Sequence, residues 1–363
     1  MDLALYHPVH GYYERTLDQV GREGDFHTSV SVGSLFGELL AWRFAEWLQE
    51  FPRDTCLHLV EAGAHQGLLA GDILRWWHRH RPELVDRVTY AIVEPSSRRR
   101  AHQRAVLAEL PGRHRWFSGL AELGDATGGI HGILFSNELL DAFPVHRLTW
   151  NATDQAWREL GVGRSEDRLI WLPREQSPSI QPPTDLFGTA PGLHTDGFLL
   201  ESCPTALQWW QQASGLLHHG HLITFDYGLE SVDFLDRPRG TLRGYRNHAH
   251  TDDVLTDPGG QDLTAHVNWT LLRDAGEAAG LTTEARETQG TFLTKVLRDQ
   301  AASDPETARL DPKRIRQFQT LTHPQHFGTR FQVLSQVRLP ARVYSLDAPR
   351  SGGYKWDACQ SPS

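Results

Sequence analysis

Glycines and other small residues follow the first segment of the sequence that is typical of a buried strand. The segment Leu59-Val60-Glu61 continues as Ala62-Gly63-Ala64-His65-Gln66-Gly67, and a helical pattern starts at Leu68. Small residues between a strand and a helix let backbone amides and the helix N-terminus approach a ligand closely. Gly63 and Gly67 also suit tight packing of the helix on the strand, so the turn indicates a cofactor site only with further support.

An acid at the end of the next strand supplies this support. Glu94 closes the apolar run 88–94 and lies 27 positions after Gly67. At this place in a nucleotide-binding α/β fold, a carboxylate accepts hydrogen bonds from both ribose hydroxyls. NAD would use the same pair, but the turn lacks the GxGxxG spacing because position 65 is His. The sequence therefore favours S-adenosylmethionine, and an NAD-dependent oxidoreductase is the weaker alternative.

Two carboxylates and an amide follow a later apolar run. Asn137 and Glu138 come directly after the run 129–136, and Asp141 lies three residues beyond Glu138. If the segment turns helically, both carboxylates face one pocket, and paired carboxylates match the planar fork of donors on a guanidinium. The alternative is that Asp141 caps a helix and Glu138 is a solvated loop acid.

Histidines and aspartates are concentrated between 240 and 266. The segments 240–250 and 262–266 contain His248, His250 and His266, but their spacing matches no compact ligand set for a metal. We therefore predict a lid or substrate loop here and no metal site.

Apolar periodicity predicts the elements that position these residues. Helical spacing covers 34–51, 68–78, 98–110, 205–218 and 268–279, and strand-like runs cover 56–61, 88–94, 129–136, 221–225, 282–287 and 331–337. Strands that alternate with helices imply an α/β fold with a parallel, doubly wound sheet. Such folds bind ligands at the carboxyl ends of their strands, and Asp226-Tyr227-Gly228 follows one of these ends.

Changes in pattern divide the chain. Between 145 and 172 apolar and polar residues alternate, which predicts an antiparallel hairpin, and 177–192 is a connector rich in Pro, Thr and Gly. The predicted organisation is a helical cap and lid (1–52), the first half of the core (53–145), an inserted hairpin and loop (146–196), the second half of the core (197–338) with a substrate-loop insertion (229–267), and a polar tail (339–363).

Composition excludes several classes of protein. The chain of 363 residues has 39% hydrophobic and 22% charged residues, and no window approaches the ~18 uninterrupted apolar residues of a membrane helix. A net charge of −9 argues against nucleic acid as a partner, although Arg98, Arg99 and Arg100 could form a local basic patch. The odd number of cysteines, three, argues against a disulfide framework, so we expect a soluble protein of the bacterial cytoplasm.

Ordered motifs along most of the chain carry a family resemblance. They are Leu5-Tyr6-His7-Pro8, Gly11-Tyr12-Tyr13, 24–29, 36–40, the glycine turn 61–67, Val93-Glu94, Asn137-Glu138, 141–144, Asp226-Tyr227-Gly228, 240–245 and 262–267. With these motifs the chain resembles the MidA family (DUF185) of class I S-adenosylmethionine-dependent methyltransferases. The resemblance implies a Rossmann-like methyltransferase core with a helical N-terminal cap and an inserted β-hairpin subdomain.

The resemblance also implies roles for individual residues. The cofactor site would contain Asp25, Glu61, Gly63, His65, Gly67 and Glu94; the methyl-transfer pocket would contain Asn137, Glu138 and Asp141; and Thr28, Ser29, Asp226, Tyr245 and His266 would bind substrate. Family members include a mitochondrial arginine methyltransferase of complex I assembly. The implied substrate is therefore an arginine of a protein, and a respiratory-complex subunit is the partner that this member implies.

Two departures from the family pattern support an alternative function. The family usually has glycine where this chain has His65, so we expect this side chain to turn to solvent or to lie over the ligand. The chain starts at Met1 where relatives generally have another helix, so we expect a shortened start or a reduced lid. The alternative is a non-catalytic assembly or interaction protein that has kept the fold.

Overall fold

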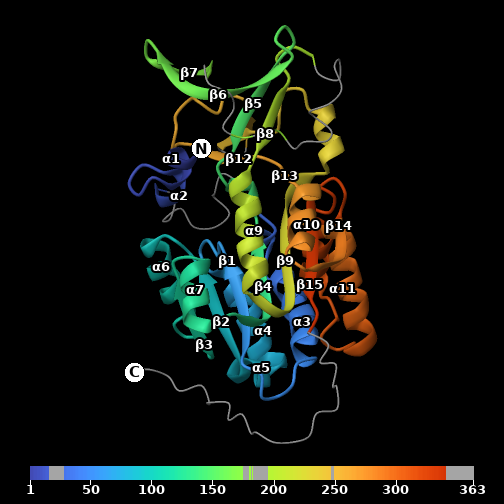
Figure 1. The fold of residues 1–363 in the computed structure, drawn as a ribbon. Helices are drawn as coiled ribbons and strands as arrows, with labels where there is room; N and C mark the ends of the chain where they lie inside the picture. The colour runs from blue at the N-terminus through green and yellow to red at the C-terminus, as the bar shows by residue number, and fades with distance from the viewer. Residues whose placement is uncertain (16–27, 175–179, 181, 183–194, 247–248, 341–363) are drawn as a thin grey trace, which may run out of the picture.

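A central sheet of eight strands organises the molecule (Figure 1). The computed structural model describes residues 1–15, 28–174, 180, 182, 195–246 and 249–340. The strands are β1 (Leu57–Ala62), β2 (Val88–Val93), β3 (Arg113–Phe117), β4 (Ile130–Asn137), β9 (Leu217–Leu229), β13 (Val267–Asn268), β14 (Thr282–Thr288) and β15 (Phe331–Arg338). Their order is β14-β15-β9-β4-β1-β2-β3, and β13 pairs with β9. From β3 to β9 all pairings are parallel, whereas β15 is antiparallel to both of its neighbours. The predicted α/β class with a Rossmann-like core is confirmed.

Helices cover both faces of this sheet because its inner strands are apolar on both sides. One core contains Leu59 and Ile133 and packs against α3, α4, α6 and α11, and the other contains Val60 and Leu134 and packs against α7, α9 and α10. The helices are α3 (Leu35–Gln49), α4 (Leu68–His80), α5 (Pro82–Arg87), α6 (Ser97–Leu107), α7 (Leu120–Thr127), α9 (Pro204–Leu216), α10 (Trp269–Ala278), α11 (Gln289–Ser303) and α12 (Pro312–Thr322). Along the described ranges, no helix is long and apolar enough to cross a membrane.

A second, antiparallel sheet is inserted between the halves of the core. It has the order β7-β6-β5-β8, with β5 (His146–Asn151), β6 (Ala156–Ser165), β7 (Arg168–Pro173) and β8 (Leu199–Ser202). The predicted hairpin therefore extends to four strands. Its last strand comes from residues that the sequence analysis assigned to the second half of the core, because Leu200 pairs with Leu148 and both are fully buried.

A third, smaller sheet and the N-terminal helices lie on the same side of the core as the inserted sheet (Figure 1). Its order is β11-β10-β12, with β10 (Arg243–Arg246), β11 (Ala249–Thr251) and β12 (Asp262–Thr264). The helices α1 (Asp2–Tyr6) and α2 (Tyr12–Arg15) share a small core with this sheet, in which Leu5 and Tyr12 pack with Leu242 and Leu263. The predicted substrate-loop insertion therefore contains regular structure.

Several elements were not predicted from the sequence, and two predicted segments lie mostly outside the described residues. The strand β3 was missed because its sequence, RHRWF, begins with three polar residues, as an edge position allows. The helices α7, α11 and α12 were also not predicted. Most of the predicted connector 177–192 and nearly all of the tail 339–363 lie outside the described residues.

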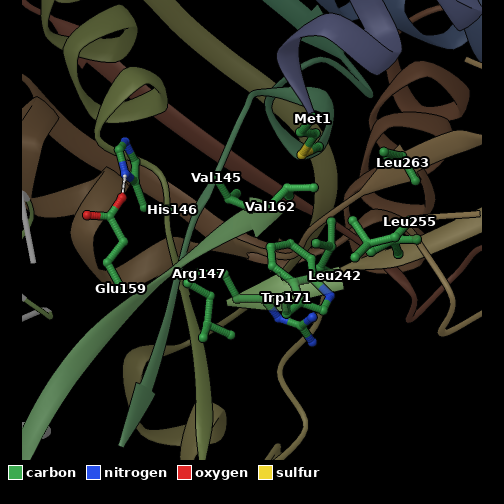
Figure 2. A pocket seen from close by; sticks show the side chains of 12 residues that line it. Met1, Val145, His146, Arg147, Glu159, Val162, Trp171, Leu242, Leu255 and Leu263 are labelled. Carbon is green, nitrogen blue, oxygen red and sulfur yellow. Dashed lines mark hydrogen bonds and ion pairs between the residues drawn. The ribbon is translucent and has the colours of Figure 1, made fainter. Parts of the chain in front are cut away.

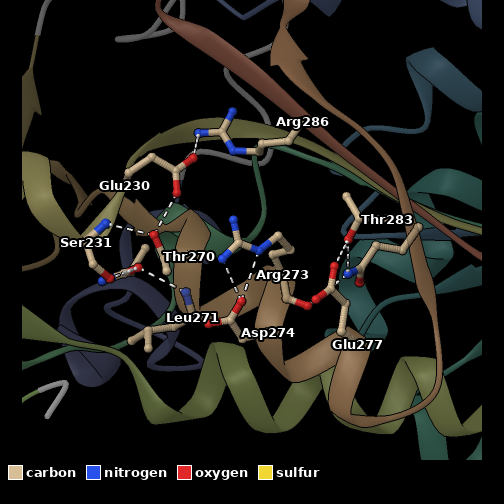
Figure 3. A network of polar contacts seen from close by, with 11 residues as sticks. Glu230, Ser231, Thr270, Leu271, Arg273, Asp274, Glu277, Thr283 and Arg286 are labelled. Carbon is tan, nitrogen blue, oxygen red and sulfur yellow. Dashed lines mark hydrogen bonds and ion pairs between the residues drawn. The ribbon is translucent and has the colours of Figure 1, made fainter. Parts of the chain in front are cut away.

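A polar network fixes α10 against the end of β9 and against β14 (Figure 3). The carboxylate of Glu230 forms an ion pair with Arg286 at 2.9 Å and accepts a hydrogen bond from the Thr270 hydroxyl at 2.6 Å. The same hydroxyl accepts the backbone N–H of Ser231 at 2.9 Å. These contacts hold the short 3-10 helix η3 (Ser231–Asp236) beside the core.

The register between β4 and β9 gives a stability prediction. Gly132 and Gly220 are cross-strand partners, and a Cβ at Gly220 would lie 1.8 Å from the carbonyl oxygen of Gly132. We expect Gly220→Ala to lower the free energy of unfolding by about 2–4 kcal/mol through backbone displacement. Gly215→Ala is the matched control because a Cβ at that position of α9 meets no atom within 4 Å. Urea denaturation of both variants checks the prediction, and equal midpoints would contradict it.

Candidate active site

A cavity of about 1100 Å³ opens at the carboxyl ends of β1, β2 and β4. Among the residues predicted for the site, it is lined by Thr28, Glu61, Gly63, His65, Glu94, Asn137, Glu138 and Asp141. Residues far apart in the sequence thus meet where parallel sheets bind their ligands. Asp25 lies outside the described residues.

The glycine turn forms one wall of this cavity. Gly63, His65 and Gly67 have positive φ angles of 72°, 46° and 78°, which bend the chain from β1 into α4. A Cβ at Gly63 would lie 2.8 Å from Leu139 Cδ1, so a side chain there would collide with the segment after β4. The N-cap of α4 is Gly67, which has no side chain to cap the helix, so the first amides of α4 can bind an anionic group. The turn fits the carboxylate end of an amino-acid cofactor.

His65 lies on the wall of the cavity, with its surface exposed and the Tyr13 ring at 6.5 Å in an edge-on contact. The surrounding protein, together with Arg99 and His102, lowers the pKa of the imidazole, so it is neutral at pH 7. Its backbone carbonyl accepts a hydrogen bond from Gln103 Nε2 at 2.9 Å. The bulky residue is therefore accommodated within an ordered turn.

Glu94 and Glu61 present carboxyl groups to the same cavity. Glu94 Oε1 accepts the backbone N–H of Ser96 at 3.0 Å, and burial raises the pKa of this carboxyl. Glu61 accepts a hydrogen bond from the Tyr90 hydroxyl at 2.6 Å, and burial raises its pKa to about 7. The fixed carboxyl of Glu94 at the end of β2 matches the acceptor that a cofactor ribose requires.

The segment after β4 turns two acids toward the other end of the cavity. Glu138 has a φ of 52°, and its Oε1 accepts hydrogen bonds from Ser29 N at 3.2 Å and Asn137 Nδ2 at 3.0 Å. Burial raises the pKa of Glu138 to about 8. Asp141 lies inside the 3-10 turn η2 (Leu140–Ala142), whose N-cap is Leu139. Asp141 is thus not a helix cap, and Glu138 is not a solvated loop acid.

Asp226 corrects the prediction of a substrate-binding residue. Its Oδ2 accepts the backbone N–H groups of Leu139, Leu140 and Asp141 at 3.2, 2.8 and 3.4 Å, and its Oδ1 accepts that of Tyr227 at 2.8 Å. The side chain is fully buried and does not line the cavity. With both oxygens occupied by the backbone, Asp226 holds η2 in place.

The pKa values of Asp141 and Asp226 follow from these contacts. Burial raises the pKa of both carboxyls, and four N–H donors oppose the rise at Asp226. Asp226, Glu138 and Asp262 raise the pKa of Asp141 further, well above its ordinary range. The pKa of Asp141 is therefore raised by burial and by three neighbouring acids, whereas hydrogen bonds from the backbone limit the rise at Asp226.

Four more predicted residues lie outside the cavity lining. Gly67 begins α4, and Ser29 is fully buried behind Glu138. Tyr245 is half-buried in β10. His266 donates its backbone N–H to the Thr241 hydroxyl at 3.1 Å, and burial lowers its pKa to about 4. Direct substrate contact at Ser29, Tyr245 or His266 is therefore not supported by the geometry.

Several residues that line the cavity were not predicted from the sequence to have a role in it. Asp262, on β12, is 7% exposed, and the Tyr6 hydroxyl donates to the carbonyl of Ala142 at 2.8 Å. Tyr12 and Tyr13 line the cavity from α2. All four were present in the motifs 5–8, 11–13 and 262–267, which were the available signal.

Arginines of α6 bind the N-terminal segment over the cavity. Arg99 Nη2 donates to the carbonyl of Tyr13 at 2.7 Å and its guanidinium lies 4.9 Å from the Tyr13 ring. Arg98 Nη1 donates to the carbonyl of Glu14 at 2.6 Å. Arg98 and Arg99 belong to the run of three arginines that the sequence suggested as a local basic patch. In the structure, both side chains bind backbone carbonyls of the N-terminal segment.

A smaller cavity, of about 160 Å³, lies between the inserted sheet and the third sheet (Figure 2). Val145, Trp171, Leu242 and Leu263 give it a mainly apolar lining, and the guanidinium of Arg147 lies 4.9 Å from the Trp171 ring. It is too small for a nucleoside. In the part of the chain that the structure describes, no cluster of His, Cys, Asp and Glu is arranged to hold a metal.

Strand order, the glycine turn and Glu94 together define a methyltransferase of the Rossmann-like class. The family model for S-adenosyl-L-methionine-dependent methyltransferases (Methyltransf_28) matches residues 39–286. Since this match covers more than half of the chain, the protein belongs to this family, and S-adenosylmethionine is its cofactor.

Curated relatives cover nearly the whole chain. The protein arginine methyltransferase NDUFAF7, mitochondrial, of Rattus norvegicus is 30% identical over 99% of this chain and 83% of its own length. The human protein of the same name is 29% identical over 97% and 82%. These identities extend beyond the core into the N-terminal segment and the insertions.

Two solved structures from Burkholderia thailandensis are also similar. One, a COG1565 superfamily member bound to S-adenosyl-homocysteine, has a TM-score of 0.78 at 27% identity, and the match covers 93% of this chain and 86% of that chain. The other, a native structure of a COG1565 superfamily protein, has a TM-score of 0.74. The likeness therefore covers most of the chain and not only the central sheet.

Glu94 gives a binding prediction. We expect Glu94→Gln to weaken binding of S-adenosyl-homocysteine about tenfold to hundredfold, because a hydrogen bond to a charged group contributes about 1.5–3 kcal/mol. Isothermal titration calorimetry measures the dissociation constant. The exposed Glu109→Gln on the turn after α6 is the control, and unchanged binding by Glu94→Gln would refute the assignment.

Proposed function

We propose that the protein transfers a methyl group from S-adenosylmethionine to an arginine of a protein substrate. The observation that carries this proposal is the set of three carboxyl groups that line the acceptor end of the cavity, those of Glu138, Asp141 and Asp262. The two arginines that line the cavity, Arg98 and Arg99, lie at the cofactor end and bind backbone carbonyls. A cationic acceptor would therefore meet carboxyl groups rather than competing cations.

The raised pKa values of the carboxyl groups at the acceptor end favour a guanidinium as the ligand. Burial and repulsion from neighbouring acids raise the pKa of Glu138 and of Asp141, so the charged forms of these carboxyls are disfavoured when no cation faces them. A cation placed between the carboxyls removes this penalty, and the planar fork of a guanidinium satisfies several acceptor atoms at once. The names of the mitochondrial relatives, protein arginine methyltransferases, support the same acceptor.

Some residues of this chain would hold the cofactor, and another would orient the substrate and accept a proton. When bound, S-adenosylmethionine supplies an electrophilic methyl group on a positively charged sulfur. Gly63, the N-terminus of α4 and Glu94 would hold the cofactor. Glu138 would orient the guanidinium and accept the proton that the methylated nitrogen releases, because a pKa of about 8 allows proton exchange near neutral pH.

Further parts of the proposal concern partner and location. A respiratory-complex subunit, the partner that the family resemblance implies, is one candidate substrate. We also propose a cytoplasmic location, which three widely spaced cysteines suit.

The second candidate function, a non-catalytic assembly protein, is favoured by His65 on the cavity wall.

Transfer of labelled methyl groups tests the function and its pH dependence. We expect the purified protein to label a lysate protein at arginine, with an initial rate that rises with pH through about 8, because only ionised Glu138 pairs with the guanidinium. Glu138→Gln should lower the rate about hundredfold or more and remove this pH dependence.

Glu166→Gln is a matched control for this experiment. Glu166 also has a positive φ, 53°, but it is exposed on the turn between β6 and β7, far in the sequence from the site. Labelling at a residue other than arginine would refute the acceptor. Cofactor binding without any labelling would favour the assembly protein instead.

A further inference from the structure

We propose that Gln289 and Ser29 are positioning residues, which hold the carboxyl of Glu138 in the orientation that the acceptor requires. The inference rests on the proposed function of Glu138. It assigns a task to Gln289, which lies at the N-terminus of α11 and in none of the sequence motifs. It also gives Ser29 a different task from the substrate contact that the family resemblance implied.

Glu138 is held on one side and open on the other. Its Oε1 accepts hydrogen bonds from Ser29 N and Asn137 Nδ2. No described residue donates a hydrogen bond to its Oε2, and the side chain lines the cavity. The two donors on one oxygen therefore fix which oxygen faces an acceptor.

The donor Ser29 is in turn fixed by a buried chain of contacts. Its hydroxyl donates to Gln289 Oε1 at 3.0 Å, and Gln289 Nε2 donates to the carbonyl of Leu321 in α12 at 3.2 Å. Ser29 and Gln289 are both fully buried. Glu138 is thus connected through two side chains to the packing of α11 on α12.

Both ends of this chain of contacts lie in tightly packed structure. Thr28 and Ser31 exchange hydrogen bonds of 3.0 and 3.1 Å, which closes the turn that contains Ser29. At the other end, Gly290 donates its N–H to the carbonyl of Gly328 at 2.9 Å, and a Cβ at Gly290 would lie 2.7 Å from the carbonyl oxygen of Thr322. Movement of Ser29 is therefore opposed by the helical layer.

A support of this kind suits the conformation of Glu138. A positive φ is unfavourable for a residue with a side chain, and surrounding contacts must maintain it. Among the described residues, the acids Asp226 on β9 and Asp262 on β12 raise the pKa of Glu138 by charge repulsion, and the same acids raise the pKa of Asp141 in η2. Repulsion from these acids would displace an unheld carboxylate, so the Ser29 N–H has to keep its position.

Ser29→Ala and Gln289→Leu test the proposal, because each removes one link and leaves the cavity lining intact. Gln300→Leu is the matched control: Gln300 is also a buried glutamine of α11, but it donates to Thr307. Infrared spectroscopy of protein with ¹³C-labelled glutamate, assigned with Glu138→Gln, reports the titration of Glu138 without any substrate. The labelling rate of lysate proteins with S-adenosylmethionine is the second readout.

In the positioning role, the loosened Ser29 N–H stabilises the charged form of Glu138 less well. We expect the pKa of Glu138 and the rising limb of the rate profile to move up by about one pH unit in both variants. We also expect labelling at pH 7 to fall about tenfold or more. The double variant should resemble the single ones, because the two residues act as one unit.

The opposite result is equally clear. If Ser29→Ala and Gln289→Leu lower the melting temperature as Gln300→Leu does and leave the titration of Glu138 unchanged, both residues are merely structural and the proposal is wrong. Should no lysate protein be labelled by the unmodified protein, the proposed function fails, whereas the infrared titration still decides the role of Ser29 and Gln289.

Discussion

The acceptor end of the active site depends on one carboxylate that never reaches the cavity. Asp226, at the end of β9, accepts four backbone N–H groups and thereby fixes the turn that follows β4. Without this carboxyl oxygen, the N–H groups of Leu139 and Leu140 would lose their hydrogen-bond acceptor. Because Glu138 and Asp141 belong to this turn, their direction into the cavity follows from a contact between adjacent strands.

The cofactor end could be predicted from the sequence because its determinants are local. A strand, a glycine turn and a helix are consecutive, and Glu94 closes the next strand, so composition and spacing reveal all of them. The same holds for the alternation of strands and helices that defines the α/β class. The edge strand β3 was missed because its first residues are polar and partly exposed, which weakens the apolar signal that periodicity detects.

The acceptor end could be predicted only in part, since its contacts join distant segments. The roles of Asp226 and Ser29 differ from expectation because a motif identifies a residue type at a place but not the atoms that it meets. Asp262 and Tyr6 enter the cavity from two added elements whose docking no local pattern specifies. Gln289 reaches Ser29 across 260 positions of sequence, a separation that periodicity cannot span.

The contact of Arg99 with Tyr13 has a thermodynamic consequence. Arg99 lies beside Glu94, where its charge favours the ionised carboxyl, and it also binds the backbone of α2 over the cavity. A ligand that strengthens the interaction between Glu94 and Arg99 must therefore stabilise the docked N-terminal segment. By the same linkage, docking of this segment must increase the affinity for the ligand by the same factor. Docking of the N-terminal segment and binding at the cofactor site are thus linked equilibria, although the residues involved come from opposite ends of the first hundred residues.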